Sequence, residues 1–356
     1  KLPPGETWPD GAERYFGLEN FGNTCYCNSI LQALYFCRPF RECVTNYPYG
    51  PAPELLRDPA VHSLSSSTTS NLFWRINCQK KQSGVVAPSQ FVNKVKKDNE
   101  LFRSTMHQDA HEFLIYVLNT VAENVLDHEK RRREQLRDAS KGEPAASQEA
   151  VTWVHQLFEG VLTNETKCLT CETVTSRDES FLDLSIDIER HSSVTSCLRQ
   201  FSASEMLCHK NKFYCDTCCG LQEAEKRMKI KKLPRVLALH LKRFKYQERL
   251  QRYIKLSYRV VFPMELRLFN TSDAAEDPDR LYSLFAVVVH IGSGPHHGHY
   301  VTIVKSAGQW LLFDDNNVHM IHEDDIENYF GDLPQNGSGY LLFYQAAGDD
   351  KLAFVP

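Results

Sequence analysis

Two features that define other classes of protein are missing from this sequence of 356 residues. No run of apolar residues approaches the roughly 18 that a helix needs to span a bilayer, so the sequence predicts no membrane partner. There is also no basic excess, because 41 Lys and Arg residues face 45 Asp and Glu residues, with a formal net charge of −4. Phosphate binding needs a concentrated basic surface, so this balance argues against nucleic acid as a partner. The length allows about two domain-sized units with a large core.

Cysteine is plentiful, and its spacing is more informative than its number. Twelve cysteines would suggest disulfides in a small secreted protein, but a chain of this size favours metal binding and catalysis in a reducing compartment. Cys168 and Cys171 form one CxxC pair, and Cys215 and Cys218 form another. Each pair can place two thiolates on one tetrahedral Zn²⁺, and four thiolates close the coordination shell. The sequence therefore predicts a structural zinc site, in preference to free thiols or a disulfide.

The spacing of apolar residues changes along the chain. In the first half, residues 25–37 and 109–126 carry apolar residues at helical spacing, and Thr24 is a candidate N-cap of the first helix. The second half contains short apolar or aromatic runs bounded by Gly, Pro and charged residues, which are typical of strands. These runs are 236–241, 285–291, 300–304, 310–313 and 340–344. A helical first half and a strand-rich second half predict an α+β fold.

Three segments have few of the residues that form a packed core. Residues 1–15 are rich in Pro, Gly and charge and are predicted to be a flexible lead-in, and residues 46–70 are predicted to be a flexible loop. Residues 127–150 contain almost no core-forming residue and are predicted to be a disordered insertion. The basic run in this insertion is either a nuclear localisation signal or, as its charge pattern favours, a solvated surface.

Cys25 stands where the first predicted helix begins, after the sequence GLENFGNT at 17–24. A thiol at a helix N-terminus lies at the positive end of the helix dipole, which lowers its pKa. The glycines and asparagines before it allow a tight loop whose backbone N–H groups could hold an oxyanion. This segment alone leaves a second interpretation open, which is an inert buried thiol.

A histidine and an aspartate near the other end of the chain could complete a catalytic group. His299 follows the Gly-rich segment 292–298 and starts a strand, which would fix it at the edge of a cleft. Asp314 ends the next strand. If these strands pair, Asp314 can hydrogen bond the ring nitrogen of His299 that is remote from the thiol. Each motif alone is weak, because Gly-rich loops often carry a surface histidine and strands often end in acids.

Five ordered blocks between residues 16 and 345 resemble those of the ubiquitin-specific proteases. NFGNTCYCNS at 20–29 resembles the Cys box of this family, and GHY at 298–300 followed by FDD at 313–315 resembles its His box. The intervening blocks are QDAHEF at 108–113, FLDL at 181–184 and LHLKRF at 239–244. The resemblance implies a papain-like right hand with a thumb, a palm and zinc-bearing fingers.

This resemblance also implies how the chain is organised. One catalytic domain would extend over 16–346, with the thumb at about 16–126 and the fingers and palm at about 151–346. The insertion would separate these two parts, and residues 347–356 would form a tail.

The resemblance further implies a role for each residue of the site. Cys25 would be the nucleophile, His299 the general base and then the general acid, and Asp314 the group that orients His299. Asn20 would help neighbouring backbone groups to stabilise the oxyanion, and Asp315 would assist through a water or a hydrogen bond. The bond cleaved would be the amide after the C-terminal Gly of ubiquitin, usually an isopeptide to lysine.

Binding the C-terminal tail of ubiquitin, which is extended and carries arginine, requires a narrow channel and carboxylates. Asp109 and Glu112 lie one turn apart at the start of the helix predicted at 109–126, and by resemblance they line this channel. They are also the acids that a helix dipole favours at an N-terminus. Tyr300 would form a wall of the channel, and the Gly-rich segment 292–298 would be a mobile gate over it.

A closer resemblance is to a small subgroup that is activated by WD40-repeat proteins. It is carried by CYCNS at 25–29 and LQALYFCRPFRE at 31–42. The implied partners are ubiquitin, ubiquitinated proteins and a WD40-repeat activator, in the cytoplasm and also the nucleus. Two departures stand out, because His107 replaces the usual Gln of the family and residues 46–78 match the subgroup poorly.

Two other functions remain as alternatives. One is a non-catalytic scaffold of the same fold that only binds ubiquitin, and the other is a protease for another ubiquitin-like modifier. A scaffold would be recognised by the loss of Cys25, His299 or Asp314, and all three are present.

Overall fold

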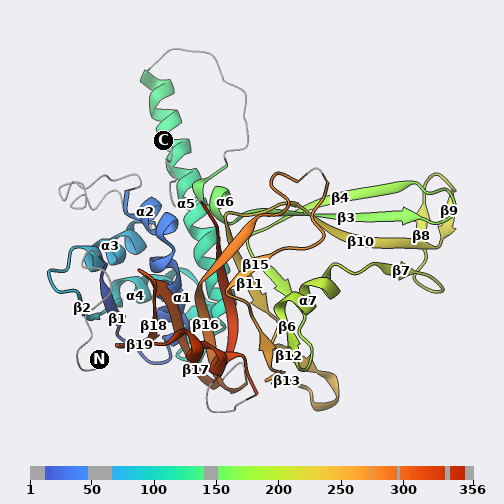
Figure 1. Ribbon diagram of the computed structural model, residues 1–356. Helices are drawn as coiled ribbons and strands as arrows, with labels where there is room; N and C mark the ends of the chain where they lie inside the picture. The colour runs from blue at the N-terminus through green and yellow to red at the C-terminus, as the bar shows by residue number, and fades with distance from the viewer. Residues whose placement is uncertain are drawn as a thin grey trace.

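The computed structural model describes residues 13–46, 66–139, 151–273, 275–294, 297–332 and 337–348. In this part of the chain, most of the helices lie on one side of a large sheet and a long arm of strands extends away from it (Figure 1). The helical part, the sheet and the arm correspond to the thumb, palm and fingers that the sequence predicts. The predicted α+β right-hand architecture is therefore confirmed. None of the described helices is both long and apolar enough to cross a membrane.

Most of the helices belong to the first part of the chain. They are α1 (Cys25–Phe36), α2 (Arg38–Asn46), α3 (Ser66–Asn77), α4 (Ser89–Asp98), α5 (Ala110–Ala139), α6 (Trp153–Phe158) and α7 (Val194–Phe201). Short 3₁₀ helices are η3 (Leu101–Arg103), η4 (Glu248–Leu250) and η5 (Glu323–Tyr329).

The central sheet contains all five of the predicted strand runs. Its strands are β5 (Leu184–Ile186), β11 (Val236–Leu241), β15 (Glu265–Arg267), β16 (Leu281–Gly294), β17 (His297–Ser306), β18 (Gln309–Asp314), β19 (Asn317–Ile321) and β20 (Ser338–Ala346). Their order is β19-β18-β17-β16-β20-β11-β5, with β15 paired to β16. β20 is the last of these strands in the chain, yet it lies in the middle of the sheet, between β16 and β11.

The arm is a second sheet, whose strands are β3 (Gly160–Cys168), β4 (Val174–Phe181), β7 (Glu205–Leu207) and β10 (Ala224–Lys232). Their order is β4-β3-β10-β7, and the hairpin of β8 (Phe213–Cys215) and β9 (Gly220–Gln222) lies at the far end of the arm (Figure 1). The remaining pairs are β1 (Tyr15–Leu18) with β2 (Ser83–Val86), β6 (Ser192–Ser193) with β14 (Val260–Val261), and β12 (Phe244–Gln247) with β13 (Arg252–Lys255).

Two hydrophobic cores lie on the two faces of the central sheet, and β16 contributes to both. Ala286 and Val288 belong to the core shared with the helices, whereas Val287 and Val289 belong to the other core. Successive side chains of a strand point to opposite faces, so a strand buried on both faces has an uninterrupted apolar run. This explains the continuous hydrophobic sequence at 285–291.

Helix α1 is buried along its whole length and packs on β17. Its buried polar groups are used for positioning. Gln32 Nε2 donates a hydrogen bond of 2.8 Å to the carbonyl oxygen of Phe16, and Thr302 Oγ1 donates one of 2.9 Å to that of Ser29. These bonds fix the helix against β1 and β17, so the position of Cys25 at its N-terminus is fixed relative to the sheet.

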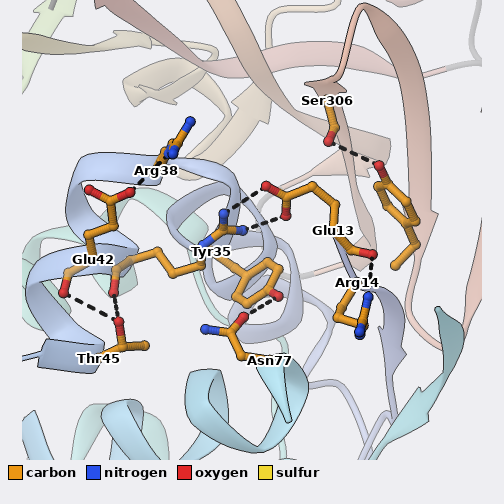
Figure 2. Close-up of polar contacts among 10 residues, drawn as sticks. Glu13, Arg14, Tyr35, Arg38, Glu42, Thr45, Asn77 and Ser306 are labelled. Atoms are coloured by element: carbon orange, nitrogen blue, oxygen red, sulfur yellow. Dashed lines mark hydrogen bonds and ion pairs between the residues drawn. The ribbon is translucent and has the colours of Figure 1, made fainter. Parts of the chain in front are cut away.

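Residues 13–15 of the predicted lead-in are ordered, so the prediction is wrong there. Arg41 donates hydrogen bonds of 2.9 and 2.8 Å to the two carboxylate oxygens of Glu13 (Figure 2). Tyr15 begins β1 and is fully buried. The rest of the lead-in, and the predicted tail 347–356 beyond Gly348, lie outside the described residues.

Two further segments predicted to be irregular are partly helical. Helix α5 continues to Ala139, so residues 127–139 are helical and the predicted disorder is wrong for them. Their Glu, Lys, Arg and Gln residues favour a helix. Helix α3 begins at Ser66, inside the loop predicted for 46–70. The remaining parts of both segments lie outside the described residues.

Candidate active site

Cys25 is the first residue of α1 and follows a tight loop that its own side chains stabilise. Gly22 has a φ of +72°, in the left-handed region that glycine adopts without steric cost. Asn20 Oδ1 accepts a hydrogen bond of 3.1 Å from the backbone N–H of Thr24. Thr24 precedes the helix, but its hydroxyl accepts a bond from the N–H of Phe21 and does not cap the helix. Thr24 therefore stands at the predicted N-cap position, but its side chain closes the loop and makes no capping hydrogen bond.

His299 and Asp314 come together because β17 and β18 pair in an antiparallel register. His299 Nε2 lies 2.6 Å from Asp314 Oδ1. The imidazole of His299 also lies close enough to the thiol of Cys25 to lower the pKa of the thiol. The strand pairing predicted from the sequence is thus confirmed, and the structure brings the three predicted residues together in one site.

The pKa values of the thiol and the imidazole are shifted in opposite directions. Burial raises the pKa of Cys25, but hydrogen bonds from His107, His299 and the backbone of Tyr300 outweigh burial and lower this pKa to about 7. Hydrogen bonds to Asp314 and Cys25 raise the pKa of His299 to about 10, against the effect of burial. The bond to His299 in turn lowers the pKa of Asp314. At neutral to mildly alkaline pH the pair can therefore exist as thiolate and imidazolium, the activated form of a cysteine nucleophile.

Asp315 follows Asp314 in the chain but binds different partners. Its Oδ2 accepts a hydrogen bond of 2.8 Å from Asn20 Nδ2, and its Oδ1 accepts one of 2.8 Å from Asn28 Nδ2. Asp315 has a φ of +47°, which places it in a turn after β18. Asp315 thus holds the loop before α1 and the helix itself, whereas Asp314 holds His299.

The three residues predicted to bind the substrate tail do not form one surface. Glu112 is exposed in the first turn of α5. Asp109 precedes α5, and both of its carboxylate oxygens lie 2.7 Å from the hydroxyl of Tyr340. Tyr300 is fully buried, and its ring stacks on that of His107 with centroids 5.2 Å apart. The prediction that the Tyr300 side chain lines a channel is therefore wrong.

The Gly-rich segment 292–298 is mainly strand. β16 and β17 cover all of it except residues 295–296, which lie outside the described residues. Lys255 Nζ donates hydrogen bonds of 2.7 Å to the carbonyl oxygen of His290 and 3.0 Å to that of Gly292. These bonds anchor the strand next to β17, so the prediction of a mobile gate is wrong for the described residues.

The sequence indicated His107 only as a departure from the usual family residue and did not place it in the site. Its Nε2 lies 3.5 Å from Sγ of Cys25, although the two residues are 82 positions apart. No periodic pattern could have revealed this contact. The only available signal was that His107 directly precedes the block 108–113, which shares the site.

A second cluster joins three of the sequence blocks to one another. The rings of His111 and His240 stack with centroids 3.8 Å apart, and His111 Nε2 lies 2.9 Å from Asp183 Oδ2. Ser185 Oγ donates a bond of 2.9 Å to Asp183 and lies 2.8 Å from His240 Nδ1. The two histidines and Asp183 are close enough to hold a metal ion, but these hydrogen bonds already engage Asp183 and one nitrogen of each ring. The cluster therefore supports the site as a hydrogen-bonded network.

The four cysteines of the two CxxC pairs meet at the far end of the arm, and their sulfur atoms all lie within 4.8 Å of one another. Sγ of Cys168 is 4.0 Å from that of Cys218, and Sγ of Cys171 is 3.5 Å from that of Cys215. Cys219 is outside this group and its thiol donates to the carbonyl oxygen of Asp216. The four thiols could hold a metal ion.

Comparisons with known proteins show the family of this chain. Residues 16–344 match the family model described as ubiquitin carboxyl-terminal hydrolase. The chain is 54% identical to ubiquitin carboxyl-terminal hydrolase 4 of Arabidopsis thaliana, over 97% of this chain and 96% of that protein. It is also 54% identical to ubiquitin carboxyl-terminal hydrolase 12 of Salmo salar, over 94% of this chain and 90% of that protein.

A solved structure is similar over nearly the whole chain. It is a chain in the structure of the SAGA Ubp8/Sgf11/Sus1/Sgf73 DUB module bound to ubiquitin aldehyde, with a TM-score of 0.72 and 27% identity. The similarity covers 96% of this chain and 72% of that chain. The chain described here therefore belongs to the ubiquitin carboxyl-terminal hydrolase family, as a ubiquitin-specific protease with cysteine-type deubiquitinase activity.

Proposed function

We propose that this deubiquitinase cleaves the amide after the C-terminal Gly of ubiquitin with a Cys25–His299–Asp314 mechanism. The observation that carries this proposal is the bond of 2.6 Å between His299 and Asp314, beside a thiol whose pKa is lowered. A thiolate is the reactive form of cysteine, and an imidazolium oriented by a carboxylate can deliver a proton.

The reaction proceeds in two steps. The Cys25 thiolate attacks the carbonyl carbon, so a C–S bond forms and the electron pair of the C=O bond moves to oxygen. The oxyanion re-forms the C=O bond as the C–N bond breaks and His299 donates its proton to the leaving lysine amine, which leaves ubiquitin as a thioester on Cys25. His299 then takes a proton from water, whose oxygen attacks the thioester carbonyl carbon. The C–S bond breaks, which releases ubiquitin as its carboxylic acid and regenerates the Cys25 thiolate, and the acid loses its proton to solvent. Asn20 and backbone N–H groups at the start of α1 stabilise the oxyanion.

Release of a fluorophore from a C-terminal amide of ubiquitin tests this assignment. Cys25→Ser is expected to remove turnover and to preserve ubiquitin binding, because a hydroxyl provides no accessible anion at neutral pH. Residual activity above a few per cent of wild type would move the nucleophile to another thiol. Cys27 would be the first to test, although burial raises its pKa.

The tail of ubiquitin is proposed to enter beside Asp109. A hollow of about 420 Å³ is lined by Asp109, His240, Phe244 and Tyr340, among other residues. Asp109 and the exposed Glu112 would attract the arginine of the tail. The same assay with other ubiquitin-like modifiers distinguishes ubiquitin from related substrates. Faster cleavage of another modifier would favour the alternative of a protease for that modifier.

The metal held by Cys168, Cys171, Cys215 and Cys218 is proposed to be zinc. Four sulfurs about 2.3 Å from a tetrahedral zinc lie about 3.8 Å from one another. The pairs at 4.0 and 3.5 Å bracket this value. A shell of four thiolates leaves no position for substrate, so the ion would stabilise the fingers and take no part in the chemistry.

A WD40-repeat protein is proposed to activate the enzyme by binding the fingers. The support is the resemblance to the activated subgroup, together with large apolar side chains exposed on this arm. They are Leu169, Val174, Met206, Tyr214 and Leu221. A partner that raises the catalytically competent fraction raises kcat in proportion, with little change in KM. Titration of the partner in the ubiquitin amide assay tests this, and full activity of the isolated chain would exclude it.

The cytoplasm and the nucleus are proposed as the locations. All twelve cysteines are free in the structure, which suits a reducing compartment. Imaging of the tagged full chain in cells tests the proposal, and accumulation in the secretory pathway would contradict it.

A further inference from the structure

The sulfur of Cys25 is in contact with two imidazoles, and the mechanism above uses only one of them. The second is that of His107, whose Nε2 lies 3.5 Å from Sγ. His107 lies between η3 and α5, whereas His299 lies on β17, so the two rings reach the sulfur from unrelated parts of the chain. The contact is therefore independent of the His299–Asp314 pair.

His107 is buried between two other rings. The side chain is buried, with 6% of the residue exposed, and its ring stacks on that of Tyr300 at an interplanar angle of 17°. The ring of His290 packs against it edge-on. Nδ1 of His107 has no hydrogen-bond partner among the described residues. A buried imidazole is costly unless it is hydrogen bonded, so the contact with Cys25 is the interaction that compensates its burial.

The direction of this hydrogen bond follows from the chemistry of sulfur. A thiolate can only accept, so a bond between His107 and the reactive form of Cys25 places the proton on Nε2. A donor to a charged group favours the charged form and lowers its pKa. Burial has the largest effect on the pKa of Cys25 and raises it. Among the effects that lower this pKa, the hydrogen bond to His107 is the largest and the bond to His299 is the second largest.

Other titratable groups surround the thiol without replacing this donor. Tyr26 and Cys27 adjoin it on α1, and burial raises the pKa of both. Asp314 raises the pKa of His299 and so affects the thiol only indirectly, and Asp315 raises the pKa of the neighbouring Cys27. Asp109 and Glu112 raise the pKa of the Tyr300 side chain, whereas the backbone N–H of Tyr300 is the group that hydrogen bonds Cys25. None of these side chains donates a hydrogen bond to Cys25, so His107 and His299 are its side-chain donors among the described residues.

We propose that His107 is a further catalytic residue of this protease, donating a hydrogen bond from Nε2 to the thiolate of Cys25. This proposal takes from the proposed function only that Cys25 is the nucleophile. His107 keeps its proton throughout the reaction, because the proton for the leaving amine comes from His299. When the C–S bond forms, the sulfur loses its charge and the bond to His107 weakens. His107 therefore determines how much thiolate is present before the attack.

Alkylation of Cys25 by iodoacetamide tests this role without any ubiquitin. The rate is measured against pH on the full chain, and mass spectrometry quantifies the label on the Cys25 peptide. His107→Leu fills the position without a donor, and His107→Gln restores an N–H donor. We expect His107→Leu to move the midpoint upward from about 7 and to slow alkylation about tenfold below it. His107→Gln should titrate close to wild type, and the rates should converge at high pH.

Two results would overturn the proposal: a wild-type titration for His107→Leu, or equal titrations for His107→Leu and His107→Gln. His191→Leu, at an exposed histidine, is the matched control for replacing an imidazole and should change nothing. Failure of ubiquitin cleavage with a normal alkylation titration would count against the proposed function alone.

A measurement on the unaltered chain covers the case in which His107→Leu does not fold. Nitrogen-15 NMR of the histidine rings reports which nitrogen carries the proton. We expect His107 to carry it on Nε2, and its signals to shift when Cys25 is alkylated. A proton on Nδ1 with a bare Nε2 would make His107 an acceptor from the thiol, which would overturn the proposal.

Discussion

Asn28 of α1 donates a hydrogen bond of 2.8 Å to Asp315, the residue that follows β18. This bond connects the buried helix that begins with Cys25 to the strand that ends with Asp314. The nucleophile and its acid–base pair belong to opposite ends of the chain, so a side-chain contact between their supports fixes their separation. Asp315 also holds Asn20, so one carboxylate positions both the helix and the loop before it.

Asp315→Ala is expected to lower kcat for the ubiquitin amide about tenfold or more, with little change in KM. Asn20 and Asn28 would lose an acceptor whose charge-assisted bonds contribute about 1.5–3 kcal/mol each, and the loop before the nucleophile would lose its position. Steady-state kinetics measures the effect. Asp324→Ala removes an exposed carboxylate of η5 and is the control. A rise in KM alone would show that Asp315 serves substrate binding.

The pH dependence of kcat/KM should be bell-shaped. Below about pH 7 Cys25 is protonated and has no nucleophilic anion, so the rate should rise as pH increases through this value. Above about pH 10 His299 has lost the proton that the leaving amine needs, so the rate should fall. Because the two groups are hydrogen bonded, the two measured values belong to the pair. Rates recorded from pH 5.5 to 10.5 check this, and an acid limb with its midpoint near 9.0, the ordinary value of a thiol, would contradict the lowered pKa of Cys25.

Removing the metal should loosen the fingers and leave the chemistry unchanged. A chelator, or Cys168→Ser, is expected to lower the melting temperature, because binding of a structural metal is coupled to folding. Cys219→Ser changes a cysteine outside the four-sulfur group and should melt like wild type. Alkylation of Cys25 should keep its rate. Metal analysis that finds no bound zinc, or an unchanged melting curve after chelation, would refute the structural role.

Arg243→Met should destabilise the fold strongly. Arg243 is fully buried and donates to the carbonyl oxygens of Gly339 at 2.6 Å and Tyr258 at 2.8 Å, with further bonds to two other carbonyls. An acceptor left unsatisfied costs about 1–3 kcal/mol, so the loss should exceed about 3 kcal/mol in total. Denaturant unfolding measures it. Lys242→Met, at the exposed neighbour, is the control, and equal stability of the two variants would contradict the prediction.

The sequence predicted well those residues whose positions depend on local secondary structure. Cys25 begins a helix, and His299 and Asp314 lie on neighbouring strands joined by a short turn, so their placement follows from local structure. The CxxC spacing likewise brings cysteines together. The contact between Asn28 and Asp315 joins positions 287 apart, and only tertiary packing creates it.

Two errors have simple physical causes. Tyr300 follows His299 on a strand, so its side chain points to the opposite face and enters the core. The two-residue period of a strand predicts this orientation. Residues 127–139 contain few apolar residues, which indicated disorder, but their helix propensity and their continuity with the rest of α5 favour a helix.

The position of β20 in the middle of the central sheet has a consequence for biosynthesis. Without this strand, β16 and β11 have no partner between them, and β16 carries the pairing that places His299 opposite Cys25. A ribosome must therefore release the chain through β20 before a nascent molecule can acquire proteolytic activity. Synthesis itself delays the enzyme, so a truncated translation product ending before Ser338 would be inert toward the ubiquitin conjugates around it.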